Sequence, residues 1–124
     1  MTQSPKITLL DSISYISAEH EGQIIISGSH GGSAAGRYAL AHPPFLVVFN
    51  DAGVGNDEAG IVALWDLEQA GIAAVTVSHN SARSGEANDT WENGRVSHVN
   101  RLAKKLGIQV EEMVKTAVVK IAKG

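Results

Sequence analysis

The chain has 124 residues, a net charge of −3, 44% hydrophobic residues and no cysteine. This length and hydrophobic content are typical of one globular domain and exclude a disordered chain. The lack of cysteine excludes disulfides, zinc–thiolate sites, iron–sulfur clusters and a cysteine nucleophile, and it is compatible with a cytoplasmic protein.

Four short apolar runs predict β-strands, at residues 7–10, 23–26, 45–49 and 72–77. Each run is almost wholly apolar, as is typical of strands that are buried on both faces of a parallel sheet. The first strand leaves two possibilities open, because serines alternate with apolar residues after it. It either runs parallel to the second strand or extends to Ile16 and forms an antiparallel hairpin with it.

Four segments have helical patterns, at residues 33–41, 56–70, 95–106 and 110–122. Asn56 is expected to be the N-cap of the second helix, since asparagine is a favoured capping residue. Between the fourth strand and the third helix, residues 80–94 are polar and predict a long loop, which in a compact domain is more often functional than neutral.

The alternation of strands and helices predicts one α/β domain that spans residues 1–124. We expect a three-layer sandwich with a mostly parallel sheet of about four to five strands, Rossmann-like in architecture.

Polar residues follow the predicted strands, and three of them point to a site: His30, Asp51 and His79. In an open parallel sheet, ligands bind beyond the carboxyl ends of the strands, near the point where the strand order reverses. We therefore expect these three side chains to be catalytic, with His30 or His79 as the acid–base group and Asp51 as its partner. Ordinary turn and capping chemistry explains the serine, asparagine and aspartate residues equally well, but histidine less well.

Histidine follows serine at Ser29-His30, Ser78-His79 and Ser97-His98. Adjacent side chains in a strand or loop usually point apart. Neither Ser29-His30 nor Ser78-His79, which lie at predicted strand ends, is therefore expected to form a nucleophile–base pair by itself. His98 is expected on a helix, as a partly buried residue without a required role.

Two glycine-rich segments have the character of ligand-binding turns. The first contains Ser29, Gly31 and Gly32 before a predicted helix, where backbone N–H groups favour an anion. The second contains Asn50 and Gly53, but it lacks both the dinucleotide G-x-G-x-x-G spacing and the lysine of a phosphate-binding loop. NAD and ATP are therefore not expected, and the cofactor stays unknown.

Ser78 and Arg83 complete the predicted ligand-binding residues, because both leave from the same strand end. Arg83 either grips a carboxylate or phosphate or pairs with Glu86 or Asp89. The function predicted from these residues is the binding of a small molecule, with His/Asp acid–base chemistry on a small polar metabolite as the enzymatic version. A divalent metal on the catalytic trio and a non-catalytic binding or oligomer-forming protein are the alternatives.

The partner expected is a small-molecule ligand, with no nucleic acid and no membrane. Cationic residues gather after residue 100, but they fall on predicted helices without interleaved aromatic residues. Residues 1–6 show no export signal, which favours the cytoplasm. A homo-oligomer is expected, because the chain is short and the helix at 110–122 has an apolar surface that extends through Val118 and Ile121.

Overall fold

The computed structural model describes residues 5–123 and contains one five-stranded sheet in the order β1-β2-β3-β4-β5. The first four strands run parallel, and β5 runs antiparallel to β4. The strands are β1 (Ile7–Leu10), β2 (Ile24–His30), β3 (Leu46–Asn50), β4 (Ala73–Val77) and β5 (Val96–Val99).

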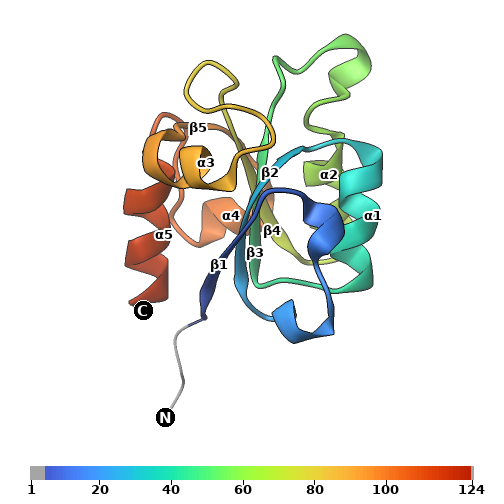
Figure 1. Cartoon of the computed structure of the whole chain (residues 1–124), viewed down its shortest axis with the longest axis vertical. Helices are drawn as coiled ribbons and strands as arrows, with labels where there is room; N and C mark the ends of the chain where they lie inside the picture. Colours follow the sequence, from blue (N-terminus) through green and yellow to red (C-terminus); the bar gives the residue numbers. More distant parts are fainter. Residues whose placement is uncertain (1–4, 124) are drawn as a thin grey trace.

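Helices cover both faces of the sheet, which gives the three layers of an α/β sandwich (Figure 1). Helices α1 and α2 lie on one face, and α3, α4 and α5 lie on the other. The helices are α1 (Ser33–Ala41), α2 (Val62–Gln69), α3 (Ala87–Asn93), α4 (Arg101–Lys105) and α5 (Val114–Ala122), with 3₁₀ turns η1 (Ile13–Tyr15), η2 (Ala18–His20) and η3 (Asn56–Glu58). The predicted α/β sandwich with a mostly parallel sheet is confirmed.

Successive residues of the apolar strands supply two separate cores. Ile24 and Ile26 of β2 pack in the core beneath α3, α4 and α5, whereas Ile25 packs in the core beneath α1 and α2. All three side chains are 0% exposed. Because both faces of the central strands are buried, their sequences are continuously apolar and do not alternate.

The first strand pairs with β2 in parallel register, with Ile7 opposite Ile24. The alternative of an antiparallel hairpin is therefore wrong. The segment that contains Ile16 forms no strand extension, since η1 and η2 carry the chain back to the start of β2.

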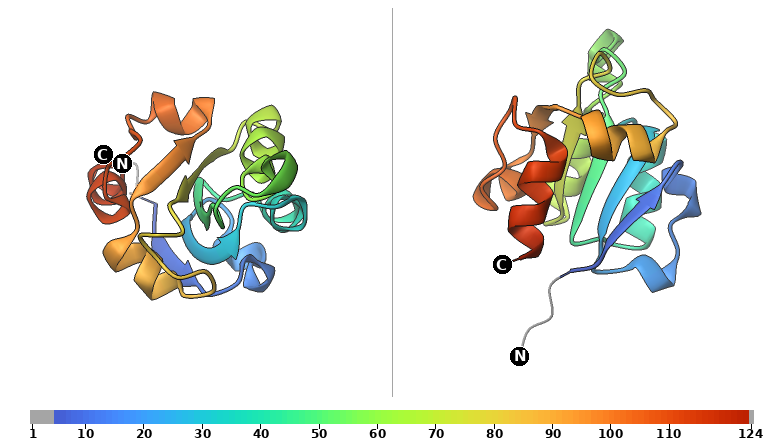
Figure 2. Two further views of the ribbon diagram at one scale, coloured as in Figure 1. Left: turned by 90° about the horizontal axis from the view of Figure 1, so that it is seen from above. Right: turned by 60° about the vertical axis from the view of Figure 1, so that its left-hand side comes forward.

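The strand order is sequential and contains no reversal, so the sheet has no crevice of the kind that a doubly wound fold forms at a reversal. The narrower description as Rossmann-like is not confirmed. The four parallel strands still place their carboxyl ends at one edge of the sheet, which is viewed from above in Figure 2.

The helix predicted at residues 95–106 is wrong, because this segment contains β5 and then α4. Asn100 separates the two elements. Its side-chain oxygen accepts hydrogen bonds from the Ala103 and Ala74 N–H groups, at 3.0 and 3.1 Å. It thereby caps α4 and ties that helix to β4, which a helix running through this residue would prevent.

Three other boundaries differ from the sequence predictions. The segment at residues 80–94 is not wholly a loop, since it contains α3. Asn56 does not cap α2, because Asp57 and Glu58 adopt left-handed backbone conformations and the helix begins only at Val62. The last helix begins at Val114 and not at residue 110, whereas α1 has the bounds that were predicted.

None of the helices in residues 5–123 has the length and apolar character that a membrane crossing requires. The prediction of no export signal in residues 1–6 lies largely outside the described residues.

Candidate functional site

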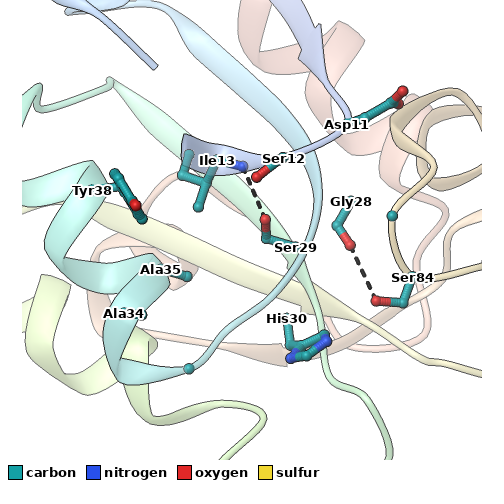
Figure 3. A pocket seen from close by; sticks show the side chains of 12 residues that line it. Asp11, Ser12, Ile13, Gly28, Ser29, His30, Ala34, Ala35, Tyr38 and Ser84 are labelled. Carbon is teal, nitrogen blue, oxygen red and sulfur yellow. Dashed lines mark hydrogen bonds between the residues drawn. The ribbon is translucent and has the colours of Figure 1, made fainter. Parts of the chain in front are cut away.

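A pocket of about 370 Å³ lies at the carboxyl ends of β1 and β2, beside the start of α1. We call it the α1 pocket. Its walls include Asp11 after β1, Ser29 and His30 of β2, Tyr38 of α1, and the turn at Ser84 (Figure 3). Two predicted site residues, Ser29 and His30, therefore share one pocket, and Gly32 lines it too.

Both Ser29 and His30 belong to β2 and do not follow it, because this strand is longer than predicted. The ladder with β3 is irregular between Ile26 and His30, and His30 pairs with Asn50. The Ser29 hydroxyl accepts a 2.9 Å hydrogen bond from the Ile13 N–H, so it holds η1 against the strand. The His30 side chain is exposed at the rim of the pocket.

The turn before α3 is packed tightly against β2 at Gly28. A Cβ at this position would lie 2.5 Å from the Glu86 nitrogen, so only glycine permits the approach. The Gly85 N–H donates a 2.6 Å hydrogen bond to the Gly28 carbonyl. The Asp11 carboxylate accepts from the Ala87 N–H at 3.0 Å, at the beginning of α3. The segment at residues 80–94, which was expected to be a long loop, thus provides a wall of the α1 pocket at Ser84 and Gly85.

The predicted glycines Gly31 and Gly32 have different roles. A Cβ on Gly31 would lie 2.8 Å from the Gly60 carbonyl oxygen, and the Gly31 carbonyl accepts from the Ala63 N–H at 2.8 Å. Gly31 therefore permits α1 and α2 to pack together. Gly32 is the N-cap of α1 and provides no side chain to cap it, so the first N–H groups of the helix are left for solvent or a ligand.

A second polar group lies where β3 and β4 end. Asp51 is 5% exposed, and its side chain accepts hydrogen bonds from the Gly53 N–H at 2.8 Å and the His79 N–H at 3.1 Å. The same carboxylate oxygen lies 3.4 Å from His79 Nδ1, and the His79 side chain is 51% exposed. Two predicted catalytic residues are therefore in contact, with the carboxylate inside and the imidazole facing solvent.

The pKa of Asp51 shows how this pair is held. Burial raises the pKa of the carboxyl, and the hydrogen bond from the Gly53 N–H acts in the opposite direction. The Ser97 hydroxyl and the N–H and charge of His79 also lower this pKa, which lies below its ordinary value. Asp51 is therefore ionised at neutral pH.

Three predicted ligand-binding residues at this edge have local structural contacts. Asn50 is 0% exposed, donates to the Ala82 carbonyl at 2.9 Å and accepts from the Ala52 N–H at 2.8 Å. Gly53 has a φ of +76°, which favours glycine, and a Cβ there would lie in ordinary van der Waals contact with the His79 ring, at 3.5 Å. The Ser78 hydroxyl accepts from the Asn80 N–H at 3.1 Å and shapes the turn after β4.

A polar cluster that the sequence did not predict lies between β4 and β5. Thr76 Oγ1 lies 2.9 Å from Ser97 Oγ and 3.2 Å from His98 Nδ1, and the last two atoms are 3.1 Å apart. His98 lies on β5 and not on a helix. A signal was present, because Thr76 is the polar residue within an otherwise apolar strand and is 0% exposed.

Arg83 does not line the α1 pocket. Its side chain is 82% exposed and its guanidinium lies 3.9 Å from the Glu86 carboxylate, while its backbone N–H donates to Asp89 at 2.7 Å. The structure thus shows the local pairing that sequence analysis offered as the alternative to anion binding.

The carboxyl edge therefore holds two distinct polar regions. Neither Asp51 nor His79 lines the α1 pocket, so His30 is set apart from the other two predicted catalytic residues. Within residues 5–123, no group of three or more His, Asp or Glu side chains is placed to hold a metal ion, which leaves the metal hypothesis without a ligand set.

These features define an α/β protein with a polar pocket and a separate carboxylate–imidazole pair at the same sheet edge. No protein-family model, curated protein or solved structure matches the chain.

Proposed function

We propose that this chain binds a small polar metabolite at the carboxyl edge of its sheet and acts on it by acid–base chemistry. His79 would transfer the proton, and Asp51 would orient it. The observation that carries the proposal is the buried Asp51 carboxylate beside Nδ1 of a half-exposed imidazole. A carboxylate in this position favours a proton on Nδ1 and leaves Nε2 free to accept or release one.

The α1 pocket supports the binding half of the proposal. Uncapped N–H groups at the start of α1 and the exposed His30 favour a carboxylate or phosphate group of the ligand. The one carboxylate in the wall, that of Asp11, already accepts a hydrogen bond from Ala87. Because His30 pairs with Asn50, a ligand anchored there extends along the edge toward Asp51.

A thermal-shift screen tests binding. The probes are inorganic phosphate, citrate, malate and a panel of sugar phosphates and amino acids. A compound at about 100 times its Kd raises the free energy of unfolding by about 2.7 kcal/mol. We expect a hit whose shift is lost in His30→Ala and kept in the matched control His42→Gln, whose imidazole pairs with Glu21 at the other end of α1. A shift that persists in His30→Ala would contradict binding in the α1 pocket.

Turnover of the same compound tests the chemistry. We expect its NMR signals to change over time with the wild-type protein and the His42→Gln control. Asp51→Asn and His79→Gln should bind it and leave it largely unchanged, with a rate loss of about 10²-fold or more. Equal turnover by all four proteins would rule out the Asp51–His79 pair.

A non-catalytic binding protein is the second candidate. It is favoured by one observation, namely that the α1 pocket does not include Asp51 or His79. A ligand that stabilises the wild-type protein and stays chemically unchanged would support this candidate and contradict the enzymatic one.

The cytoplasmic location, the absence of a nucleic-acid partner and the homo-oligomer stay predictions. The face of α5 that was expected to meet a partner packs in the chain's own core, since Val118 is 1% exposed and Ile121 packs against the same cluster. An oligomer would need another surface, such as that around Phe45, which is 40% exposed. Sedimentation velocity tests the prediction, and a strict monomer would contradict it.

A further inference from the structure

The α1 pocket has two sides of different chemistry. Figure 3 shows Ile13, Ala35 and Tyr38 on one side, which is mainly apolar, and Asp11 and Ser84 with their side-chain oxygens on the opposite side. The volume of about 370 Å³ is near the lower end of the range of about 300–1,000 Å³ that is typical of ligand sites. The pocket therefore suits a small ligand that has one apolar face and one polar face.

Tyr38 provides an aromatic ring on the apolar side. Helix α1 packs against the rest of the protein through its buried small residues Ala35, Gly36 and Ala39. Tyr38 is not one of these residues and is 46% exposed, so the core does not depend on its ring. A tyrosine in such a position offers a flat apolar face and a polar tip, which is why this residue is frequent at binding surfaces. The ring is thus available to a ligand in the pocket.

Two hydroxyls of the pocket have hydrogen-bonding capacity that the fold does not use. The Ser29 oxygen accepts from the Ile13 N–H at 2.9 Å, and the Ser29 proton forms no hydrogen bond within residues 5–123. The Ser84 hydroxyl donates to the Gly28 carbonyl at 3.4 Å, which leaves the Ser84 oxygen to accept. The pocket therefore offers one donor and one acceptor from uncharged groups. A hydroxyl of a ligand can accept from the first and donate to the second.

Asp11 determines which ligand groups the polar side tolerates. Its Oδ1 accepts from the Ala87 N–H at 3.0 Å, and its Oδ2 has no hydrogen-bond partner in the described part of the chain. A carboxylate oxygen accepts but does not donate, so it favours a hydroxyl of the ligand and repels an anion. His30 lies at the other end of the view in Figure 3. An anionic group therefore belongs beside His30, and the side near Asp11 suits uncharged hydroxyls.

We propose that the ligand of the α1 pocket is a monosaccharide unit, either free or carried in a phosphate ester. Its C–H face would lie on the Tyr38 ring, and its hydroxyls would bind Asp11 and Ser29. This deepens the proposed function and rests on it, since it takes the α1 pocket as the binding site. A sugar ring matches the pocket because it has an apolar face and a rim of hydroxyls that each donate and accept.

A nucleobase also stacks on an aromatic ring, but the polar side of the pocket does not match one. Asparagine, glutamine and arginine are the side chains that read the edge of a base through paired hydrogen bonds. None of them is among the described residues that line the α1 pocket. The lining favours the sugar, and a free base serves as a competitor in the test.

Isothermal titration calorimetry of the full chain tests the ligand class. The probes are D-ribose, D-glucose, ribose 5-phosphate and glucose 6-phosphate, and the competitors are inorganic phosphate, malate and adenine. We expect at least one sugar probe to bind, and every competitor to bind at least about tenfold more weakly. Malate or inorganic phosphate that binds as tightly as the best sugar probe would overturn the inference and leave the proposed function in place. Adenine as the tightest ligand would also overturn it, in favour of a base.

Substitution of Tyr38 tests the apolar side with the best sugar probe. Tyr38→Ala should weaken its binding by about tenfold or more, because the ring no longer covers the C–H face. The variant should fold, since alanine is a strong helix former and position 38 is exposed. Tyr38→Phe keeps the ring and should retain most of the affinity. Tyr15→Ala is the matched control, because Tyr15 is 65% exposed and does not line the pocket.

Asp11→Asn tests the polar side. The amide oxygen can still accept from the Ala87 N–H, while the charge and the second acceptor are lost. We expect the affinity for the sugar probe to fall by about 3–10-fold and the affinity for inorganic phosphate to rise. Wild-type affinity for the sugar in both Tyr38→Ala and Asp11→Asn would overturn the inference.

The outcomes separate this inference from the proposed function. A sugar that binds through Tyr38 and stays chemically unchanged would support the inference and contradict acid–base catalysis. A carboxylic acid that is turned over by the Asp51–His79 pair, without binding of any sugar probe, would do the opposite. Binding of no compound at all would overturn both.

Discussion

The α1 pocket and the Asp51–His79 pair lie at the same sheet edge and are built in opposite ways. The α1 pocket provides space, and its polar groups are mostly backbone N–H groups and hydroxyls. The Asp51–His79 pair provides two ionisable side chains in contact with each other. Under the proposed function, recognition therefore belongs to the ends of β1 and β2, and proton transfer belongs to the ends of β3 and β4.

The two regions meet at the turn that follows β3. The Gly60 N–H donates to the Val54 carbonyl at 2.7 Å, and the Gly31 N–H donates to the Asn50 carbonyl at 3.1 Å. Between Asn50 and Gly60, four non-glycine residues have positive φ angles, namely Ala52, Val54, Asp57 and Glu58. Backbone strain of this kind persists where the surrounding contacts impose it. Substitutions of glycines in this turn and in the wall of the α1 pocket therefore test whether the two regions are independent.

The largest effect is expected at Gly60, where a Cβ would collide with the carbonyl oxygen of Asp51. Gly60→Ala should lower the free energy of unfolding by about 3 kcal/mol, because the backbone that carries Asp51 must shift. Urea denaturation measures this. Gly55→Ala is the matched control, since its φ is +74° and nothing lies within 4 Å of its Cβ, and it should lose about 1 kcal/mol. Equal losses would contradict the prediction that the collision at Gly60 costs more than the conformational strain at Gly55.

A smaller loss is expected at Gly28, on the pocket side. Gly28→Ala should cost about 2 kcal/mol, since the turn at Gly85 and Glu86 must move away from β2. Hydrogen exchange of the Gly85 amide should become faster, while the His79 tautomer should stay as in the wild type. A changed tautomer would break the comparison, because it would show that the two regions are coupled.

The next effect concerns Asp51 and depends on pH. Its pKa is below the ordinary value of 3.8 in the folded protein, so the folded state favours the ionised carboxyl. The resulting stabilisation is fully present above that ordinary value and is lost as pH falls through the lower folded pKa. Asp51→Asn should therefore be less stable than the wild type by about 1 kcal/mol at pH 7. The difference should shrink below about pH 4 in denaturation series, and a constant difference would contradict this assignment.

The sequence predicted the parallel strands because each contains an almost wholly apolar run that is followed by turn residues. It failed at β5 because Val96, Val99 and Leu102 recur at helical spacing although two different elements contain them. The change from strand to helix occurs at Asn100, whose four hydrogen-bond partners include residues distant in the chain, at Leu64 and Ile72. Local periodicity does not contain that information.

The candidate site divides in the same way. Asp51 and His79 were predictable, because parallel strands place their carboxyl ends at one edge. The cluster of Thr76, Ser97 and His98 was not, since Ser97 and His98 enter it through an antiparallel strand and a bulge. Asn50 and Gly31 were assigned to a ligand but have structural contacts, because buried backbone groups need hydrogen-bond partners and close packing excludes side chains.

Arg83 is where the smallest effect is expected. An exposed guanidinium 3.9 Å from Glu86 contributes little, so Arg83→Ala should change the free energy of unfolding by less than about 0.5 kcal/mol. It should also leave the thermal shift from any ligand of the α1 pocket unchanged, since Arg83 does not line that pocket. A loss of affinity of about tenfold or more would show that the side chain swings in to bind an anion. In that case the turn that carries Arg83 would add a cationic side chain to the uncapped N–H groups at the start of α1.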